Sequence, residues 1–386
     1  MRGLAVLACL WACTAQAQIE LRRRVRVDFY QGPVVSASRV MGLGGAYVSI
    51  AEGADGHLVN PASLAVRSAH TADDWFDWDV SLSWLNVAPG QADLDQSGRP
   101  GDFESAQLAQ LGANVKFGRH GIGLLLASQI YTLERTIDSV PELIEYGQSM
   151  GGPGYAYAFW DGALTVGVVF LGGTAEVKGS GGGTIAKVTG AGSLLGALYS
   201  PPERNWRLGA TLRSEVIGKD FSGEAAVSDV LVPGELVVPW EIAVGASYLW
   251  GARHYNRPPT FGDEGKTPAP PPARRGLLMS ADLLMTGPVD DAVSARAFLD
   301  GDGRQSGEEA SLSLRMGAEM EIFPDRMAVR AGSYYEPSRL EGFAGRFHGT
   351  AGADLRIEFG WNWKIAAVID AADDYLNWGL GLGFWH

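Results

Sequence analysis

Apolar and polar residues alternate along many stretches of this chain. In residues 75–87, Phe76, Trp78 and Trp84 fall on one face of an extended chain, and Asp77 and Asp79 fall on the other. A period of two is typical of a β-strand with one apolar and one polar face. We mark about fourteen such segments, at 75–87, 108–117, 122–133, 154–159, 164–177, 186–199, 206–213, 240–248, 277–287, 312–322, 327–335, 347–359, 361–370 and 376–384. The pattern predicts an all-β chain.

The lengths of the connections distinguish a membrane barrel from a soluble sandwich, which shows similar alternation. If the first strand runs outward, the connections at one end are brief, at 118–120, 160–162, 201–205, 324–325 and 360. Most connections at the other end are long, at 88–107, 134–152, 218–234 and 288–309. Short periplasmic turns and long outer loops are typical of bacterial outer-membrane barrels. We therefore expect an antiparallel outer-membrane β-barrel of about 14 strands over residues 75–386.

One connection departs from this rule. Residues 251–275 would form a long periplasmic turn, and their prolines exclude strand pairing and favour an extended, solvated chain. Either the strand count is off by one before this point, or the segment is a periplasmic arm that could bind a periplasmic protein partner.

The two ends of the chain support export to the outer membrane. Arg2, an apolar stretch from Leu4 to Cys13 and the sequence Ala15-Gln16-Ala17 form a secretory signal, so we expect residues 1–17 to be removed. Cys13 also ends a stretch loosely like a lipoprotein signal, to which Trp11 is poorly suited. The final segment, 376–384, carries apolar residues on one face and resembles the C-terminal strand by which such barrels are recognised for insertion. That strand normally ends on Phe or Trp, whereas this chain ends on His386.

Composition narrows the class further. Charged residues make up 19% of the chain, Gly numbers 52 and Trp 12, and the net charge is −13. A strongly acidic chain is a poor partner for nucleic acid, so we expect none. Both cysteines, Cys9 and Cys13, lie in the expected signal, so the mature chain would contain no cysteine. After the signal no run of 18 apolar residues occurs, so the sequence predicts no membrane-spanning helix.

Residues 39–64 form a broken, glycine-rich stretch with a distinctive order of features. A GLGGAY sequence at 42–47 is followed by an acidic-alanine segment and by Asn60-Pro61-Ala62. This order resembles the N-terminal region of the FadL/TodX family of outer-membrane transporters for long-chain fatty acids and other hydrophobic compounds. The family usually has glycine after this triplet, where this chain has Ser63. A wider set of barrels, including the PorV type, carries a similar segment.

The resemblance implies that residues 18–74 form a plug inside the barrel. It also implies passive, inward movement of hydrophobic molecules past that plug. The residues expected to shape the plug or the substrate path are Gly42, Gly44, Gly45, Tyr47, Asn60 and Pro61.

Charged residues on the polar faces of the strands are expected to point into the lumen. The set of lumen charges is Arg207, Arg213, Arg315, Glu319, Asp354, Arg356 and Glu358. Unpaired charges in a narrow lumen are costly, so these side chains should pair or stay hydrated. A scaffolding role that holds the barrel open and seats the plug is the main expectation for each.

Catalysis and metal binding are not expected. His348 lies on a predicted strand without a nucleophile and base arranged for hydrolysis. The acidic stretch 299–309 fails the EF-hand spacing because Arg304 and Gln305 occupy the places of a ligand and the glycine. We expect no cofactor and no metal.

Two functions remain open from the sequence. The first is an outer-membrane barrel, in contact with lipid, that passes a hydrophobic small molecule such as a long-chain fatty acid. The second is a non-transporting, PorV-like barrel that serves secretion, surface attachment or docking of an envelope machine, with residues 251–275 as the docking segment.

Overall fold

The computed structural model of the protein describes residues 23–30, 32–66, 75–93, 105–137, 140–179, 182–219, 231–251, 255–256, 276–300 and 303–385. The expected signal, residues 1–17, lies outside these ranges, as does most of the 251–275 segment.

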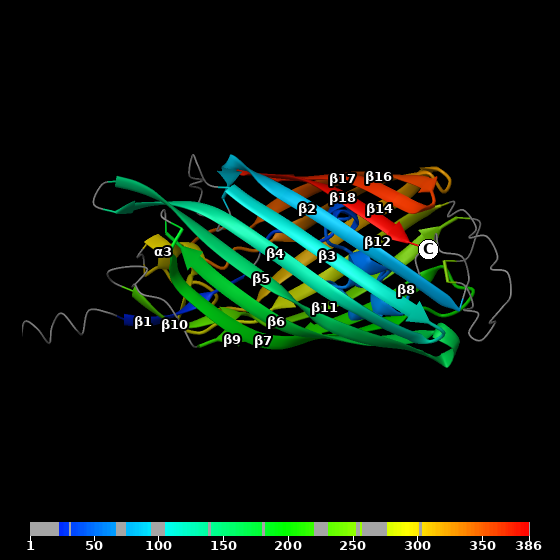
Figure 1. Cartoon of the computed structure of the whole chain (residues 1–386), viewed down its shortest axis with the longest axis horizontal. Coiled ribbons are helices and arrows are strands. Elements are labelled where there is room, and N and C mark those ends of the chain that lie inside the picture. Colours follow the sequence, from blue (N-terminus) through cyan, green and yellow to red (C-terminus); the bar gives the residue numbers. More distant parts are fainter. Residues whose placement is uncertain are drawn as a thin grey trace, which may run out of the picture.

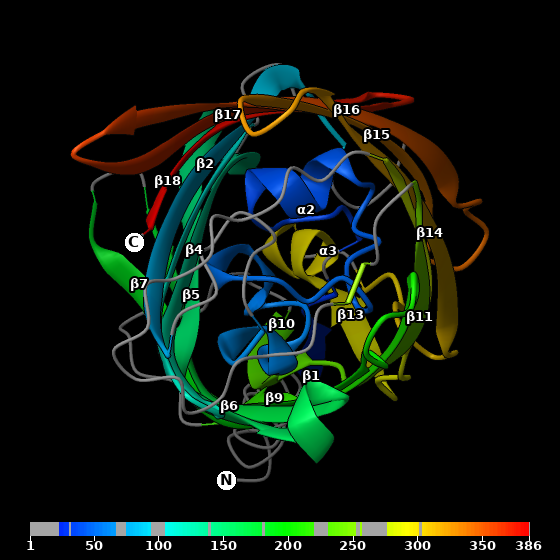
Figure 2. The same ribbon diagram turned by 90° about the vertical axis from the view of Figure 1, so that its right-hand side faces the viewer.

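Fourteen antiparallel strands close into a barrel that runs the length of the molecule (Figures 1 and 2). In chain order they are β2 (Phe76–Ala92), β3 (Ser105–Phe117), β4 (His120–Ile137), β5 (Val140–Phe159), β6 (Leu164–Lys178), β7 (Thr184–Tyr199), β8 (Trp206–Arg213), β11 (Glu241–Trp250), β12 (Leu277–Thr286), β14 (Ser311–Phe323), β15 (Met327–Glu336), β16 (Arg346–Phe359), β17 (Trp361–Ala372) and β18 (Tyr375–Trp385). The last strand, β18, pairs with β2, and β8 pairs with β11. The wall therefore has no open strand edge. The predicted all-β class, antiparallel pairing and strand number are confirmed.

The outer surface of the barrel is apolar, as the alternation predicts. Large side chains such as Leu82, Leu314 and Ile365 are half exposed on it, because their partners in the alternation point inward. At the end of the barrel where β2 begins, the rings of Trp361, Trp363 and Phe384 gather, with centroids 5.3–6.3 Å apart. Aromatic girdles at the edge of an apolar band mark the level of the lipid headgroups in membrane barrels. Among the described residues, no helix is long and apolar enough to cross a membrane.

The two ends of the barrel differ in their connections, as expected. We call the end with the turns at 118–119, 324–326 and 360 the short-turn end, and the opposite end the long-loop end. The connection from β11 to β12 leaves from the short-turn end, so the strand count before residue 251 is not off by one. The prediction of a long outer loop at 134–152 is wrong. β4 and β5 continue through it and pair as far as Ile137 and Val140.

A second, small sheet lies at the long-loop end, on the left in Figure 1. It consists of β1 (Arg23–Asp28), β9 (Val216–Gly218), β10 (Leu231–Val238) and β13 (Ala292–Ser294), with the helix α3 (Ala295–Asp300) beside it. The N-terminal strand β1 lies between β10 and β13 and pairs in parallel with both. Parts of the expected long loops 218–234 and 288–309 are therefore ordered by pairing with the N-terminal strand.

Residues 33–66 lie inside the barrel, and we call them the inner segment (Figure 2). The chain enters it from β1 at the long-loop end and leaves it near the start of β2 at the short-turn end. It contains only short elements, α2 (Ser38–Gly42), η1 (Ala54–Gly56) and η2 (Pro61–Leu64). Asn60 caps η2 by accepting a hydrogen bond from the Ala62 amide at 3.0 Å, and Pro61 fits the first helical position because it has no N–H to satisfy.

Candidate functional site

The inner segment is almost wholly buried. Five of its large apolar side chains are 0% exposed, as expected in a protein core rather than in a loop. They are Val40, Met41, Tyr47, Ile50 and Leu64. Its backbone hydrogen bonds are those of turns and short helices, such as the bond from the Ala51 amide to the Tyr47 carbonyl at 3.0 Å, so contacts with the barrel wall are needed to hold it in place.

The glycines of the sequence motif give the inner segment its compact path. Gly44 and Gly45 have φ of 61° and 78°, a left-handed conformation that other residues adopt only with strain. A side chain at Gly44 would also meet the backbone of Ser333 at 2.8 Å. Gly42 has no such φ and instead allows close approach, since its Cβ position lies 3.5 Å from the Gly352 Cα.

Inward-facing glycines of the wall match this path. Four cross-strand pairs face the inner segment, and we call them the glycine girdle: Gly123 with Gly154, Gly167 with Gly196, Gly209 with Gly245, and Gly317 with Gly332. A Cβ at Gly332 would lie 2.4 Å from the Gly44 amide nitrogen, and one at Gly209 would lie 2.2 Å from the Val48 carbonyl oxygen. The backbone of the inner segment therefore packs directly on the backbone of the wall.

Hydrogen bonds add to this packing on several strands. The Ser280 hydroxyl on β12 donates to the Ala46 carbonyl at 2.8 Å, and the Val48 amide donates to Asp282 Oδ2 at 2.8 Å. Asn60 binds both the inner segment and the wall, because its Nδ2 donates to the Val48 carbonyl at 2.7 Å and to the Ala197 carbonyl on β7 at 3.1 Å. The NPA turn thus connects the inner segment to itself and to the wall.

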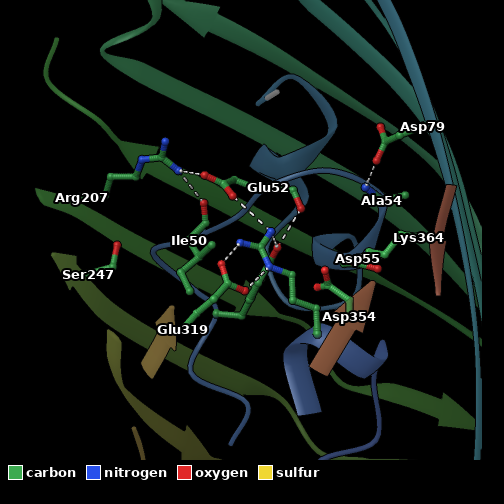
Figure 3. Close-up of polar contacts among 12 residues, drawn as sticks. Ile50, Glu52, Ala54, Asp55, Asp79, Arg207, Ser247, Glu319, Asp354 and Lys364 are labelled. Atoms are coloured by element: carbon green, nitrogen blue, oxygen red, sulfur yellow. Dashed lines mark hydrogen bonds and ion pairs between the residues drawn. The ribbon is translucent and has the colours of Figure 1, made fainter. Parts of the chain in front are cut away.

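An ion network lies at the centre of the interior (Figure 3). Arg39 of α2 donates from Nε and Nη2 to Glu319 of β14 at 2.8 and 2.7 Å, and from Nη1 to Glu52 at 3.2 Å. Glu52 also accepts from Arg207 of β8 at 2.9 Å. Glu52 is 2% exposed, so these charges are withdrawn from water and depend on each other.

The network continues along the inner face of the wall. Arg330 of β15 pairs with Glu319 and with Asp354 of β16, and Arg356 donates to Glu321 at 2.8 Å. Its members balance in charge, with four arginines and four carboxylates: Arg39, Arg207, Arg330, Arg356, Glu52, Glu319, Glu321 and Asp354. We call this set the ion network. It connects two points of the inner segment, Arg39 and Glu52, to four wall strands.

A second set of ion pairs holds the inner segment near η1. Asp55 accepts from Lys364 of β17 at 2.5 Å and from the Ser81 hydroxyl of β2. Burial alone would raise the pKa of Asp55, but Lys364 and Ser81 outweigh it and lower the pKa below the usual range. Asp55 therefore stays ionised.

His57, in contrast to Asp55, is buried without a charge. Burial is the main cause that lowers its pKa to about 4, and Lys116 adds to the effect. The imidazole is therefore neutral at neutral pH, and protonating it disfavours the seated inner segment.

A cavity of about 90 Å³ remains between the inner segment and the wall. Its lining is mixed. Apolar side chains come from Val34, Val48 and Leu58 of the inner segment and from Leu194 and Leu284 of the wall, and polar ones include Arg213, Glu241, Asp282 and Arg315. Charged groups also face it. Arg213 pairs with Glu241 at 3.0 Å, whereas no carboxylate of the described residues lies within ion-pair distance of Arg315. The cavity therefore combines apolar and charged walls. Arg315 makes no ion pair among the described residues, but Asp282, opposite it in the pairing of β12 with β14, lines the same cavity.

The residues expected from the sequence are not all in one place. Arg207, Glu319, Asp354 and Arg356 belong to the ion network, and Arg213 and Arg315 line the cavity. Glu358 lies on the inward face of β16, but its side chain is 67% exposed and reaches Arg326 at 3.7 Å near the short-turn end. It takes no part in the network.

Of the motif residues, Tyr47 lies in the core rather than on the cavity. Its hydroxyl accepts from Arg39 at 2.9 Å and donates to the Glu52 carbonyl at 2.9 Å.

Sequence reasoning missed three features. These are the partners Arg39 and Glu52 in the inner segment, and the glycine girdle. The girdle left a signal in the sequence, because Gly209, Gly245 and Gly317 recur at inward positions of alternating strands, where a polar residue would be expected.

Comparison with known structures agrees with this architecture. A FadL homologue from Pseudomonas aeruginosa superposes with a TM-score of 0.56 at 14% identity, over 92% of this chain and 99% of that one. The toluene transporter TodX from Pseudomonas putida gives 0.55 at 13% identity, over 94% and 99%. The toluene transporter TbuX from Ralstonia pickettii gives 0.52 at 14% identity, over 92% and 99%. Comparison with protein-family models and with curated protein sequences finds no match.

The protein thus has the FadL-type fold, a closed barrel of fourteen strands. The resemblance that residues 42–62 suggested is confirmed for the fold, across nearly the whole chain. At these identities the comparison shows the fold alone, and function has to be argued from the site.

Proposed function

We propose that this protein is a bacterial outer-membrane transporter that passes hydrophobic small molecules inward past the inner segment. The observation that carries the proposal is the partly apolar cavity between the inner segment and the wall, inside a barrel with the fold of hydrocarbon channels. In this proposal residues 1–17 are removed on export, residues 18–74 form the plug, and residues 75–386 form the transmembrane barrel. The short-turn end faces the periplasm and the long-loop end faces outward.

The size of the cavity supports a closed state. A cavity of about 150 Å³ in a protein core holds benzene, whereas this one measures about 90 Å³. A long-chain fatty acid is several times larger. Cargo can therefore pass only when the inner segment moves, and the glycine girdle and ion network set how readily it does so.

The proposed cargo is amphipathic and carries a carboxylate group, because the cavity has apolar side chains and Arg315 makes no ion pair there, although Asp282 also lines it. Apolar side chains such as Val34 and Leu284 would contact the hydrocarbon part, at about 25 cal/mol for each Å² removed from water. The Arg315 guanidinium would pair with the carboxylate, a contact that arginine makes with two parallel hydrogen bonds. Passage follows the concentration gradient of the cargo.

The test is uptake of labelled oleate and of labelled toluene by cells that lack their own carriers for both. We expect cells with the protein to take up oleate faster than cells without it, and Arg315→Gln to reduce oleate uptake more than toluene uptake. Uptake of neither compound above the background of cells without the protein would overturn the proposal. Faster uptake of toluene alone would retain the transporter and remove the carboxylate preference.

The docking role considered from the sequence depends on residues 251–275. Of these, 252–254 and 257–275 lie outside the described residues, so the role stays a prediction. Deleting 258–272 and finding that a surface or secretion phenotype is lost, with no uptake of either compound in the parent, would favour it.

A further inference from the structure

Two residues of the connection between β11 and β12 are buried at the short-turn end. Tyr255 and Asn256 are 5% and 4% exposed, although they lie in a connection and not in a strand. Buried residues in a connection need a specific reason, because each buried polar group must be hydrogen-bonded.

Asn256 uses all its polar groups in contacts with the start of β8. Its Nδ2 donates to the carbonyl oxygens of Pro201 and Trp206 at 2.8 and 3.0 Å. Its backbone amide donates to the Arg204 carbonyl, and its carbonyl accepts from the Glu203 amide, both at 3.1 Å. Its Oδ1 accepts from Arg207 Nε at 2.7 Å. Asn256 is therefore fixed to the β7–β8 turn.

Tyr255 contacts the other side of the same arginine. The Arg207 guanidinium lies over the Tyr255 ring, with the guanidinium carbon 3.8 Å from the ring centroid. A guanidinium stacks on an aromatic face with a favourable cation–π energy, most of all when both are withdrawn from water. The Tyr255 amide is held by Asn205 Oδ1 at 3.0 Å.

Arg207 is also the wall residue that holds the middle of the inner segment. Its Nη1 donates to Glu52 Oε1 at 2.9 Å and to the Ile50 carbonyl at 3.0 Å. One edge and one face of the guanidinium are thus bound by the connection, and another nitrogen by the inner segment. A planar group fixed on two sides presents the remaining donor in one direction and loses less freedom on binding.

We propose that Tyr255 and Asn256 are positioning residues, which we call the clasp, that orient Arg207 so that it retains the inner segment. The clasp deepens the proposed transport function and rests on it for its biological meaning. Its physical content is independent, because it concerns only how often the inner segment leaves its seat. Loss of the clasp raises the population with Glu52 released and Arg207 turned away, without changing the hydrogen-bonded wall.

A thiol reporter measures that population directly. The mature chain is expected to contain no cysteine, so Ser49→Cys in the inner segment introduces a single thiol. Ser49 is 0% exposed and its hydroxyl has no hydrogen-bond partner among the described residues, so the exchange is mild. Labelling by a maleimide in detergent is slow while the segment is seated. Its rate rises in proportion to the displaced population when opening and closing are fast.

In this background Asn256→Ala should raise the labelling rate roughly ten-fold or more, as expected for losing a hydrogen bond to a charged group. Tyr255→Leu should raise it as well, whereas Tyr255→Phe, which keeps the ring, should leave it near the parent value. Asn377→Ala is the matched control, since Asn377 is also buried but lies on β18, away from Arg207. Each variant is first shown to migrate heat-modifiably, as a folded barrel does.

The double variant with Glu52→Gln separates positioning from general loosening. If the clasp acts through Arg207 on Glu52, Asn256→Ala should add little to the labelling rate of Glu52→Gln. The proposal would be overturned if the two substitutions multiplied each other's effect on the labelling rate in the double variant. It would also be overturned if Tyr255→Phe raised the labelling rate as much as Tyr255→Leu, or if Asn256→Ala did not raise it. None of these measurements uses a cargo, so a failure of the transport proposal would show in uptake and leave the labelling result unchanged.

Discussion

Removing the carboxylate of Glu52 tests whether the ion network holds the inner segment. Glu52 is 2% exposed and lies between two guanidinium groups, Arg39 at 3.2 Å and Arg207 at 2.9 Å. Glu52→Gln keeps the shape of the side chain and removes its charge. Both arginines then face an amide in a site that excludes water.

The expected cost follows from the contacts that remain. Breaking a buried ion pair by removing one partner costs about 3–5 kcal/mol. Arg39 keeps its two hydrogen bonds to Glu319 at 2.7 and 2.8 Å, so the lower end of that range applies. About 3 kcal/mol raises the population of the displaced inner segment by roughly 100-fold, since each 1.4 kcal/mol is a factor of ten. The barrel wall should keep its stability because its strand pairing is unchanged.

Conductance in planar bilayers is the assay, because a displaced inner segment opens an aqueous path. Glu52→Gln should open far more often than the parent at the same voltage and salt. Glu358→Gln is the control, since Glu358 also lies on the inward face but its side chain is 67% exposed. Equal conductance for the parent and Glu52→Gln, with the barrel folded in both, would refute the claim that the network holds the segment.

Two further predictions concern the seat of the inner segment. Gly332→Ala places a Cβ 2.4 Å from the Gly44 amide nitrogen and should unseat the segment by about 1–3 kcal/mol, raising conductance, whereas Gly349→Ala, with open space around it, should not. Acid should also unseat it. His57 has its pKa lowered to about 4 when buried and near 6.5 when displaced, so stability is full above pH 6.5 and falls as the pH drops towards 4. The total loss is roughly 3 kcal/mol at about 1.4 kcal/mol per pH unit. Conductance should rise over that window, and His57→Gln should remove most of the rise; a pH dependence unchanged by His57→Gln would assign it to other groups.

The strands could be predicted from the sequence because a barrel wall with an apolar outer face and a polar inner face imposes a strict period of two. For β5 the sequence predicts only residues 154–159, since Gly151, Gly152 and Pro153 are typical of a loop. In the structure β5 continues through them. Pairing with β6 is interrupted at residues 152 and 153, because proline has no N–H to donate, but pairing with β4 is continuous there. Pairing with β4 alone is enough to keep residues 152 and 153 in the strand, and a single sequence does not show that this pairing forms.

The interior was harder to predict for a different reason. Alternation identifies which charged residues face inward, and it placed Arg207, Glu319 and Asp354 correctly on that side. It does not say which of them meet, because the partners Arg39 and Glu52 lie in an irregular segment without a period. β1 shows the same limit. Val25, Val27 and Phe29 alternate with polar residues, but their pairing with strands more than 200 residues away is not encoded locally.

A reversible cross-link between the inner segment and the wall tests the central claim most directly. The hydroxyls of Ser38 on α2 and Ser83 on β2 lie 2.9 Å apart, so Ser38→Cys with Ser83→Cys can form a disulfide in a chain otherwise expected to contain no cysteine. The proposal that cargo passes the inner segment predicts that the oxidised double variant loses uptake of labelled oleate and toluene and that a reductant restores it. The two single variants should transport as the parent does in both conditions. Uptake by the fully oxidised double variant equal to that of the parent would contradict the account.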